Sequence, residues 1–219
     1  SMPVTKWNYQ ITSAEKIPEA VAKAFYFAKS GRPGPVLLDI TKDAQIQEFD
    51  FHYKRIKSIR SYNPKPTLDN KQVQQALDLM KQSKKPMLLA GHGILIANAC
   101  DELLEFVDKT KIPTAVTLLG KSAIDENHPC FVGMLGMHGN YAPNKLTNEA
   151  DLIIAAGMRF DDRVTGDINR YAPNAKVIHI DIDKAELNKN VKADLAIHAD
   201  IKELLQQILP EQYQTCEAQ

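Results

Sequence analysis

Residues 151–166 decide the fold, and they read Asp-Leu-Ile-Ile-Ala-Ala-Gly-Met-Arg-Phe-Asp-Asp-Arg-Val-Thr-Gly. The first six residues, an aspartate followed by five apolar residues, have the pattern of a buried parallel strand. Gly157 follows, and then two arginines and two aspartates. Segments that follow the strands of open α/β sheets present ligand-binding groups, so this pattern favours a site for an anionic ligand. The alternative is a solvated loop whose Asp and Arg side chains pair only with each other.

Strands and helices alternate on both sides of this stretch. We predict helices at 68–82, 96–110, 141–148 and 201–209, and strands at 86–90, 113–118, 130–132, 151–156, 176–182 and 195–197. Alternating strands and helices imply right-handed crossovers. The sequence therefore predicts an α/β fold, a doubly wound parallel sheet flanked by helices.

The N-terminal part follows a different pattern. Ser13 and Gly31 bound a predicted helix, and a strand is predicted at 35–40. One helix and one strand are too little to close a core, so residues 1–45 are expected to be the end of a domain. Residues 46–66 resemble a linker, residues 67–209 a second domain, and residues 210–219 a polar tail or linker.

Bulk composition excludes several classes of partner. The 27 Lys and Arg residues balance 27 Asp and Glu residues, so no global field attracts nucleic acid. No apolar run approaches the roughly 20 residues of a bilayer span, and the first residues do not resemble a secretion signal, which predicts a cytoplasmic protein without membrane contact. Cys100, Cys130 and Cys216 lack the spacing of a disulfide framework or a zinc site.

Polar and glycine-rich segments follow several of the predicted strands. Gly91-His92-Gly93 could receive a phosphate on its backbone N–H groups, although such a turn is weak evidence alone. From the residues alone, His92 is better read as a space-filling or solvent-facing side chain. Residues 117–120 and 136–140 take the same position after other strands, as does Asp181, whose carboxylate suits a ribose or an adenine amine. Asp181 and Asp183 have no third ligand for a metal ion.

These motifs together resemble a known family, the large catalytic subunit of acetohydroxyacid synthase (acetolactate synthase), a thiamine-diphosphate enzyme that also carries FAD. The segment 157–166 resembles its GxRFDDRVTG signature, and residues 30–36, Ser-Gly-Arg-Pro-Gly-Pro-Val, resemble the end of its pyrimidine-binding domain. The motifs matching its central domain are residues 91–93, 117–119, 135–139, 157–164, 181–182 and 198–200. Two residues depart from the pattern: His92 replaces a small residue, and Ala199 replaces a glycine.

The resemblance implies a set of cofactor contacts. The residues expected to contact FAD are Arg32, Gly91, His92, Gly93, Thr117, Leu118, Leu135, Gly136, Met137, His138, Gly157, Met158, Arg159, Asp161, Arg163, Val164, Asp181, Ile182, Ala199 and Asp200. Among these, Arg159 and the glycine turn would serve the diphosphate or ribityl part, and Asp181 the adenosine end. Arg163 suits the carboxylate of an acceptor 2-ketoacid and Met137 its alkyl group, while Lys42 would add positive charge.

The activity implied for the parent enzyme is the condensation of two pyruvates, or of pyruvate and 2-ketobutyrate, with release of CO2. Thiamine diphosphate and Mg2+ would be bound by other regions, because no Gly-Asp-Gly…Asn pattern occurs in these residues. This chain alone is therefore expected to be inactive. The implied partners are small 2-ketoacids, the remaining domains of the same polypeptide, a second copy of the chain and a regulatory small subunit. The alternatives are another thiamine-diphosphate enzyme, such as pyruvate oxidase or glyoxylate carboligase, and a non-catalytic nucleotide-binding module.

Overall fold

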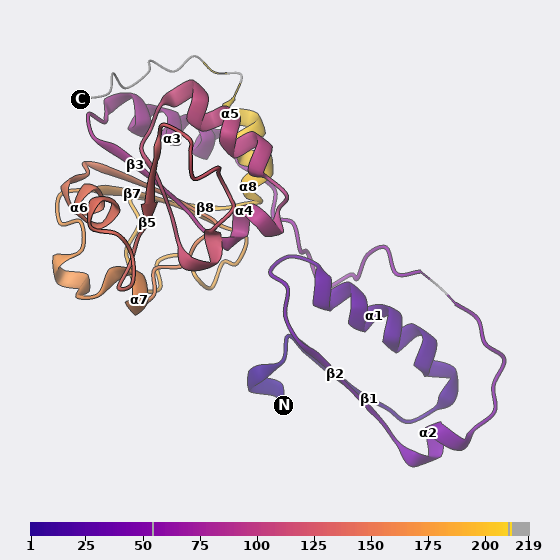
Figure 1. Ribbon diagram of the computed structural model, residues 1–219. Helices are drawn as coiled ribbons and strands as arrows, with labels where there is room; N and C mark the ends of the chain where they lie inside the picture. Colours follow the sequence, from indigo (N-terminus) through magenta and orange to yellow (C-terminus); the bar gives the residue numbers. More distant parts are fainter. Residues whose placement is uncertain (54, 210, 212–219) are drawn as a thin grey trace. The chain divides into compact units, whose positions relative to one another are not determined.

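The computed structural model describes residues 1–53, 55–209 and 211, which form two compact units, Ser1–Lys65 and Pro66–Gln219 (Figure 1). The division falls beside the end of the segment predicted as a linker. The tail predicted at 210–219 lies outside the described residues except for Glu211.

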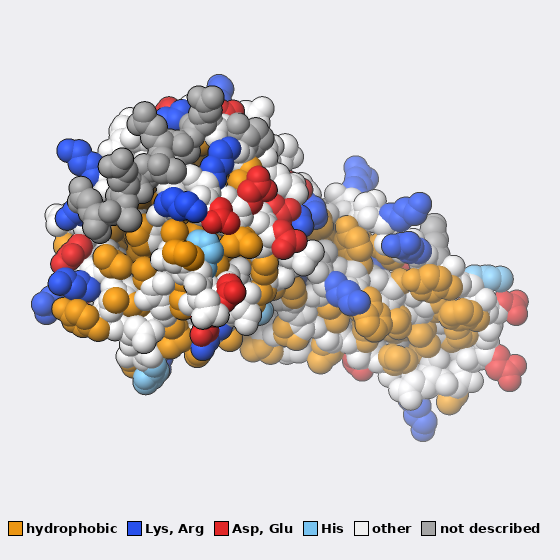
Figure 2. Space-filling view, turned by 45° about the horizontal axis from the view of Figure 1, so that its top comes forward, with side chains coloured by type: hydrophobic (Ala, Val, Ile, Leu, Met, Phe, Trp, Pro, Cys, Tyr) orange, Lys and Arg blue, Asp and Glu red, His pale blue; other side chains and the backbone are white. Residues whose placement is uncertain are grey.

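The N-terminal unit is a two-stranded parallel sheet with helices. Its elements are η1 (Met2–Val4), β1 (Trp7–Ile11), η2 (Ala14–Lys16), α1 (Ile17–Lys29), β2 (Val36–Ile40) and α2 (Lys42–Ile46). β1 pairs with β2 from Trp7↔Val36 to Ile11↔Ile40. Its buried core consists of Ile11, Ala20 and Ala44, and Figure 2 shows hydrophobic side chains over much of the visible face of this unit.

The expectation of one helix and one strand in residues 1–45 was wrong. The strand at Trp7–Ile11 was missed, although its apolar and polar residues alternate with the period of a half-buried strand. The short helix Lys42–Ile46 was missed as well, and it runs one residue into the predicted linker. The linker itself contains one isolated bridge, between Ile59 and Tyr62.

The C-terminal unit is the predicted doubly wound sheet. Its elements are α3 (Asn70–Gln82), β3 (Pro86–Ala90), α4 (His92–Ile96), α5 (Cys100–Thr110), β4 (Thr114–Val116), η3 (Leu118–Gly120), β5 (Phe131–Met134), α6 (Tyr141–Glu149), β6 (Leu152–Ala156), α7 (Asp162–Thr165), η4 (Ile168–Arg170), β7 (Lys176–Asp181), β8 (Leu195–His198) and α8 (Ile201–Ile208). The sheet has the order β5-β4-β3-β6-β7-β8, and all its pairs are parallel. The predicted fold class is confirmed.

Two core clusters explain why this sheet is stable. Every residue of β3 and β6 is buried, as expected for strands covered on both faces. Figure 1 shows α3, α5 and α8 together on one side of the sheet, where Leu103 and Leu205 belong to the larger cluster. On the other side, Leu89 and Ile153 pack with Phe160 in the second cluster.

Helix boundaries differ from the prediction at one place that matters for the site. The single helix predicted at 96–110 is wrong: α4 ends at Ile96 and α5 begins at Cys100, with Asn98 between them at a φ of 52°. The short helix α7 was not predicted because its four residues are too few to show a helical period. None of the helices in the described residues is long and apolar enough for a membrane span.

Candidate functional site at the carboxyl edge of the sheet

The site is positioned by the reversal of strand order between β3 and β6. The chain leaves β3 toward one side of the sheet and begins the other half at β6. Ligands of doubly wound proteins bind at such a reversal, outside the carboxyl ends of the strands. Here those ends lead into Gly91-His92-Gly93 and Gly157-Met158-Arg159, so the two segments that sequence analysis singled out lie side by side.

The glycines of these two segments pack backbone against backbone. The N–H of Gly91 donates to the carbonyl of Ala156 at 2.9 Å, and the N–H of Gly93 donates to the carbonyl of Gly157 at 2.8 Å. Gly157 has a φ of +60°, and a Cβ on Gly93 would come within 2.6 Å of its Cα. These two N–H groups therefore face β6, and the amide of His92 is the remaining one in the turn. The glycines are explained by close packing between the loops.

The loop after β4 joins this arrangement through His92. The Nδ1 atom of the exposed His92 ring lies 2.8 Å from the carbonyl oxygen of Leu119. Thr117 caps η3 by accepting a hydrogen bond from the N–H of Gly120 at 3.1 Å. This cap leaves Leu118 and Leu119 as exposed apolar side chains, 66% and 68% accessible. Large apolar side chains of this kind at a sheet edge are suited to a flat ring.

The loop after β6 carries the charged residues. Arg159 forms an ion pair with Asp161, with 3.2 Å between Nε and Oδ2, and its side chain stays 55% exposed. The other carboxylate oxygen of Asp161, Oδ1, is buried and has no hydrogen-bond partner in the described residues. Asp162 and Arg163 form no ion pair with each other in the described part of the chain, so the pairing of Asp with Arg in this segment is limited there to Arg159 and Asp161.

A buried histidine on β7 contacts the same loop. His179 on β7 is 1% exposed, and its Nε2 donates to the carbonyl of Met158 at 2.8 Å. Its ring packs against that of Phe160, with 5.0 Å between centroids. Burial lowers the pKa of His179 below its ordinary value, although the Met158 carbonyl and the carboxylates of Asp181 and Glu186 oppose that shift. The imidazole is therefore a neutral structural support.

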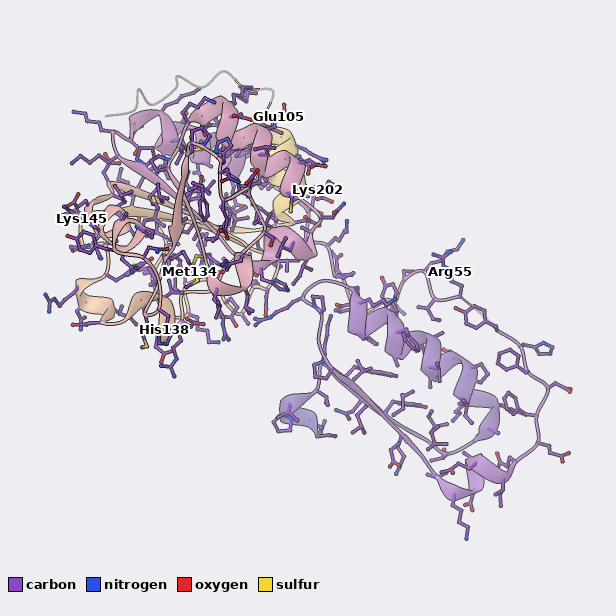
Figure 3. All side chains as sticks on the ribbon, viewed as in Figure 1. Arg55, Glu105, Met134, His138, Lys145 and Lys202 are labelled. Atoms are coloured by element: carbon purple, nitrogen blue, oxygen red, sulfur yellow. The ribbon has the colours of Figure 1, made fainter. Side chains whose placement is uncertain are left out.

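The loop after β5 meets the loop after β6. The N–H of Met137 donates to the carbonyl of Arg163 at 2.7 Å, and the Nη1 of Arg163 lies 3.8 Å from the Sδ of Met137. Leu135 is buried beneath them, while His138 is exposed. Figure 3 shows His138 at the rim of this unit, further out than Met134 at the end of β5. The structure thus brings together the two residues that the sequence predicts for an acceptor.

A hydrogen bond connects the end of β8 to the residue that follows β7. His198 Nε2 donates to the carbonyl of Ile182 at 3.0 Å, and the N–H of Asp183 donates to the Asp181 carboxylate at 2.8 Å. Asp200 caps α8 by accepting from the N–H of Lys202 at 3.0 Å, and Ala199 is fully buried. Ala199 and Asp200 therefore have structural roles that the sequence did not indicate.

Four further residues from the prediction take other positions. Met158 is buried, so only its backbone is available to a ligand, while Val164 is half-buried in α7. Arg32 and Lys42 belong to the N-terminal unit, where both are exposed and Lys6 donates to the carbonyl of Arg32 at 2.9 Å. Within the described residues, no group of three or more His, Cys, Asp or Glu side chains could hold a metal ion.

The polar residues that hydrogen-bond to these loops were not among the residues predicted from the sequence. His179 lies inside an apolar strand and Asn144 inside a helix, so neither has the loop position that suggested the other candidates. The Asn144 side chain is hydrogen-bonded to both the N–H and the carbonyl of Gly136. A polar residue near the start of a helix that follows a glycine-rich loop is the signal that could have found it.

Comparison with known proteins gives a consistent family. Residues 73–208 match the thiamine pyrophosphate enzyme central domain. The chain is 46% identical over 211 residues to a probable acetolactate synthase large subunit of Methanocaldococcus jannaschii. The aligned residues cover 95% of this chain and 36% of that protein.

Two bacterial relatives agree. The acetolactate synthase large subunit of Corynebacterium glutamicum is 44% identical, over 95% of this chain and 33% of its own length. The acetolactate synthase isozyme 2 large subunit of Escherichia coli is 43% identical, over 94% of this chain and 37% of its own length. This chain thus spans about a third of the length of the relatives that it matches. It belongs to the thiamine pyrophosphate enzyme family, and residues 73–208 are the central domain of that family.

Proposed function

We propose that this chain is part of an acetolactate synthase large subunit and that its C-terminal unit binds FAD at the carboxyl edge of the sheet. The observation that carries the proposal is the arrangement of that edge. Two exposed guanidinium groups, Arg159 and Arg163, follow β6, and the exposed apolar side chains of Leu118, Leu119 and Met137 follow β4 and β5 at the same edge. A cofactor with a diphosphate and a flat ring system needs this combination.

The residues of the edge fit FAD in more detail. Arg159 has a free guanidinium edge beyond its ion pair with Asp161, and the buried Oδ1 of Asp161 is an unsatisfied acceptor that a ribityl hydroxyl could satisfy. Asp181 stands at the end of β7, where its carboxylate suits an adenosine group. When bound, FAD would have a structural role with no net redox turnover. The amide of His92 and the exposed leucines would be its neighbours after β3 and β4.

The acceptor side of the site would lie beside Met137 and Arg163. The arginine offers bidentate hydrogen bonds to the carboxylate of a 2-ketoacid, and the methionine a polarisable apolar surface for its alkyl group. Their mutual contact of 3.8 Å places both functions within reach of one small molecule. Lys42, on the N-terminal unit, is our candidate for additional positive charge.

The whole protein would condense two pyruvates, or pyruvate and 2-ketobutyrate, and release CO2. Thiamine diphosphate would supply the carbanion chemistry, with Mg2+ binding its diphosphate, and both would be held by other parts of the polypeptide. We propose residues 1–45 as the end of the pyrimidine-binding domain, residues 46–66 as a linker and residues 67–209 as the central domain. A second copy of the chain and a regulatory small subunit are the proposed partners, in the cytoplasm.

The Arg163→Ala variant of the full-length protein that carries this chain tests the proposal. We expect pyruvate decarboxylation to stay nearly intact, because it does not involve the acceptor, and flavin content to stay nearly intact, because Arg159 would still serve the diphosphate. Carboligation and the preference between pyruvate and 2-ketobutyrate as acceptor should fall, since only the second ketoacid loses its carboxylate partner. Product analysis measures both. Loss of flavin with an unchanged acceptor preference would show that Arg163 is structural, and absence of acetolactate from the unaltered protein would refute the proposed activity.

A further inference from the structure

Asn144 holds the loop after β5 by its side-chain amide. Its Oδ1 accepts a hydrogen bond from the N–H of Gly136 at 2.9 Å, and its Nδ2 donates to the carbonyl of the same residue at 3.0 Å. Nδ2 also donates to the carbonyl of Asn140 at 3.0 Å. Both amide donors and one acceptor position are thus used, which fixes the orientation of the amide. The bonds to Gly136 span eight residues and leave α6, so they serve the loop.

Gly136 lies between this amide and the loop after β6. It has a φ of +101°, and a Cβ there would come within 2.7 Å of the carbonyl oxygen of Arg163. The next residue, Met137, donates its N–H to that same oxygen at 2.7 Å. The backbone of Gly136 is thus in close contact with Arg163 on one side and hydrogen-bonded to Asn144 on the other. A displacement of Gly136 would necessarily alter the Met137–Arg163 contact.

We propose that Asn144 is a positioning residue that sets the placement of Met137 relative to Arg163, and thereby the choice between acceptor 2-ketoacids. The inference rests on the proposed function of these two residues. A misplacement of about 1 Å in a substrate-positioning group can lower a rate about a hundredfold. Asn144 touches neither acceptor nor cofactor in this proposal, and it acts through the backbone of Gly136.

The first test is hydrogen exchange on this chain. Asn144→Ala removes the acceptor of the Gly136 N–H, so we expect the amides of Gly136 and Met137 to exchange about tenfold faster, the effect of losing roughly one hydrogen bond. Asn148→Ala is the matched control. Asn148 lies one turn later on α6, donates to the carbonyl of Asn144 and accepts from the N–H of Ala172 at 2.8 Å, and so makes no bond to the loop. Asn148→Ala should leave the exchange rates of both amides unchanged.

The second test uses the full-length protein that carries this chain. With pyruvate and 2-ketobutyrate in competition, Asn144→Ala should change the product ratio by at least about threefold while pyruvate decarboxylation stays within about twofold, and Asn148→Ala should change neither. Asn144→Asp retains an acceptor for Gly136 and loses both amide donors, and it should give an intermediate ratio. If Asn144→Ala does not fold, Asn144→Asp still provides the product ratio, because it lacks the amide group that donates to the carbonyl of Gly136.

The outcomes separate the inference from the proposed function. Unchanged exchange at Gly136 and Met137, or faster exchange with an unchanged product ratio, would overturn the role of Asn144. A control variant that shifts the ratio equally would overturn it too, because the effect would then be general loosening of α6. Failure of the unaltered protein to form either product would instead refute the proposed function, and the exchange result would still decide whether Asn144 holds the loop.

Discussion

The two units are built from the same components, parallel strands and helices, but they bury very different amounts of apolar surface. In the C-terminal unit, β3 and β6 are buried along their whole length between two core clusters. In the N-terminal unit, β2 alternates half-buried and exposed residues, and the core consists of Ile11, Ala20 and Ala44. Parallel strands gain most of their stability from coverage on both faces. The larger unit should therefore carry most of the stability, and the smaller one should unfold more easily.

Core truncation should have the largest effect and should separate the units. Leu103→Ala removes a fully buried side chain from the larger cluster of the C-terminal unit, and it should lower the free energy of unfolding of that unit by about 2–5 kcal/mol. Trp7 is the single tryptophan of the chain and lies in the N-terminal unit, stacked on Phe27. Its fluorescence therefore follows the small unit, while circular dichroism follows mainly the large one.

In urea, we expect Leu103→Ala to shift the dichroism transition and leave the Trp7 transition in place. Ile11→Ala, at a fully buried position of the N-terminal unit, is the counterpart and should do the reverse. Coincident shifts of both signals in both variants would show that the units unfold together. The inference that the two units differ in stability would then be wrong.

Replacement of Asp151 should have the next largest effect on the free energy of unfolding, and it should affect the C-terminal unit alone. Its carboxylate accepts from the hydroxyl of Ser83 and from the N–H groups of Lys84 and Lys85, at 2.8 and 3.0 Å for the two amides. Burial alone would raise the pKa of Asp151, but these hydrogen bonds outweigh burial and lower it. Asp151→Ala should cost roughly 1–3 kcal/mol, because the two amides lose their acceptor.

The lowered pKa of Asp151 also gives a pH dependence. The stabilisation is fully present above the unfolded-state pKa of about 3.9 and is lost as pH falls through the lower folded-state pKa. Urea midpoints of the dichroism transition between pH 6 and pH 2 measure it. The unaltered chain should lose more stability over this range than Asp151→Ala, and equal losses would contradict the assignment.

Two backbone positions should give the smallest effects, with opposite signs in the two units. Ser122 is a non-glycine residue at a φ of 73° in an exposed loop of the C-terminal unit, and Ser122→Gly should stabilise by about 0.5–1 kcal/mol. Gly31, at a φ of +58° in the N-terminal unit, would place a Cβ 3.2 Å from the carbonyl of Pro64, so Gly31→Ala should destabilise. The midpoints from dichroism and Trp7 fluorescence give the two signs, and a stabilising Gly31→Ala would refute the strain argument.

Strands could be predicted from the sequence where they are buried on both faces, because such strands consist mainly of apolar residues. The strands at 86–90, 151–156 and 176–182 consist mainly of apolar residues, and they lie in the structure within one residue of their predicted ends. The strand Trp7–Ile11 was missed because the polar residues Asn8 and Gln10 interrupt its apolar residues. The break at Asn98 was missed because one left-handed residue ends a helix without changing its apolar period.

The candidate site could be predicted in outline for a related reason. Loops that follow parallel strands reach one edge of the sheet, so the order of strands and glycines was enough to bring residues 91–93 and 157–163 together. The sequence could not show which polar groups of these loops already form hydrogen bonds within the protein. The N–H groups of Gly91 and Gly93 donate to the end of β6, and this depends on the register between two strands that lie far apart in sequence.

The titration of FAD into this chain tests the central claim, that the carboxyl edge of the C-terminal unit binds a flavin through Arg159. Absorption bands and fluorescence quenching of the flavin report binding, and Arg170→Ala is the control because Arg170 is an exposed arginine of the same unit on η4. We predict saturable binding that Arg159→Ala weakens about tenfold or more, the loss of one charge-assisted hydrogen bond of roughly 1.5–3 kcal/mol, and that Arg170→Ala leaves unchanged. Equal affinities in all three proteins, or no binding to the unaltered chain, would contradict the account.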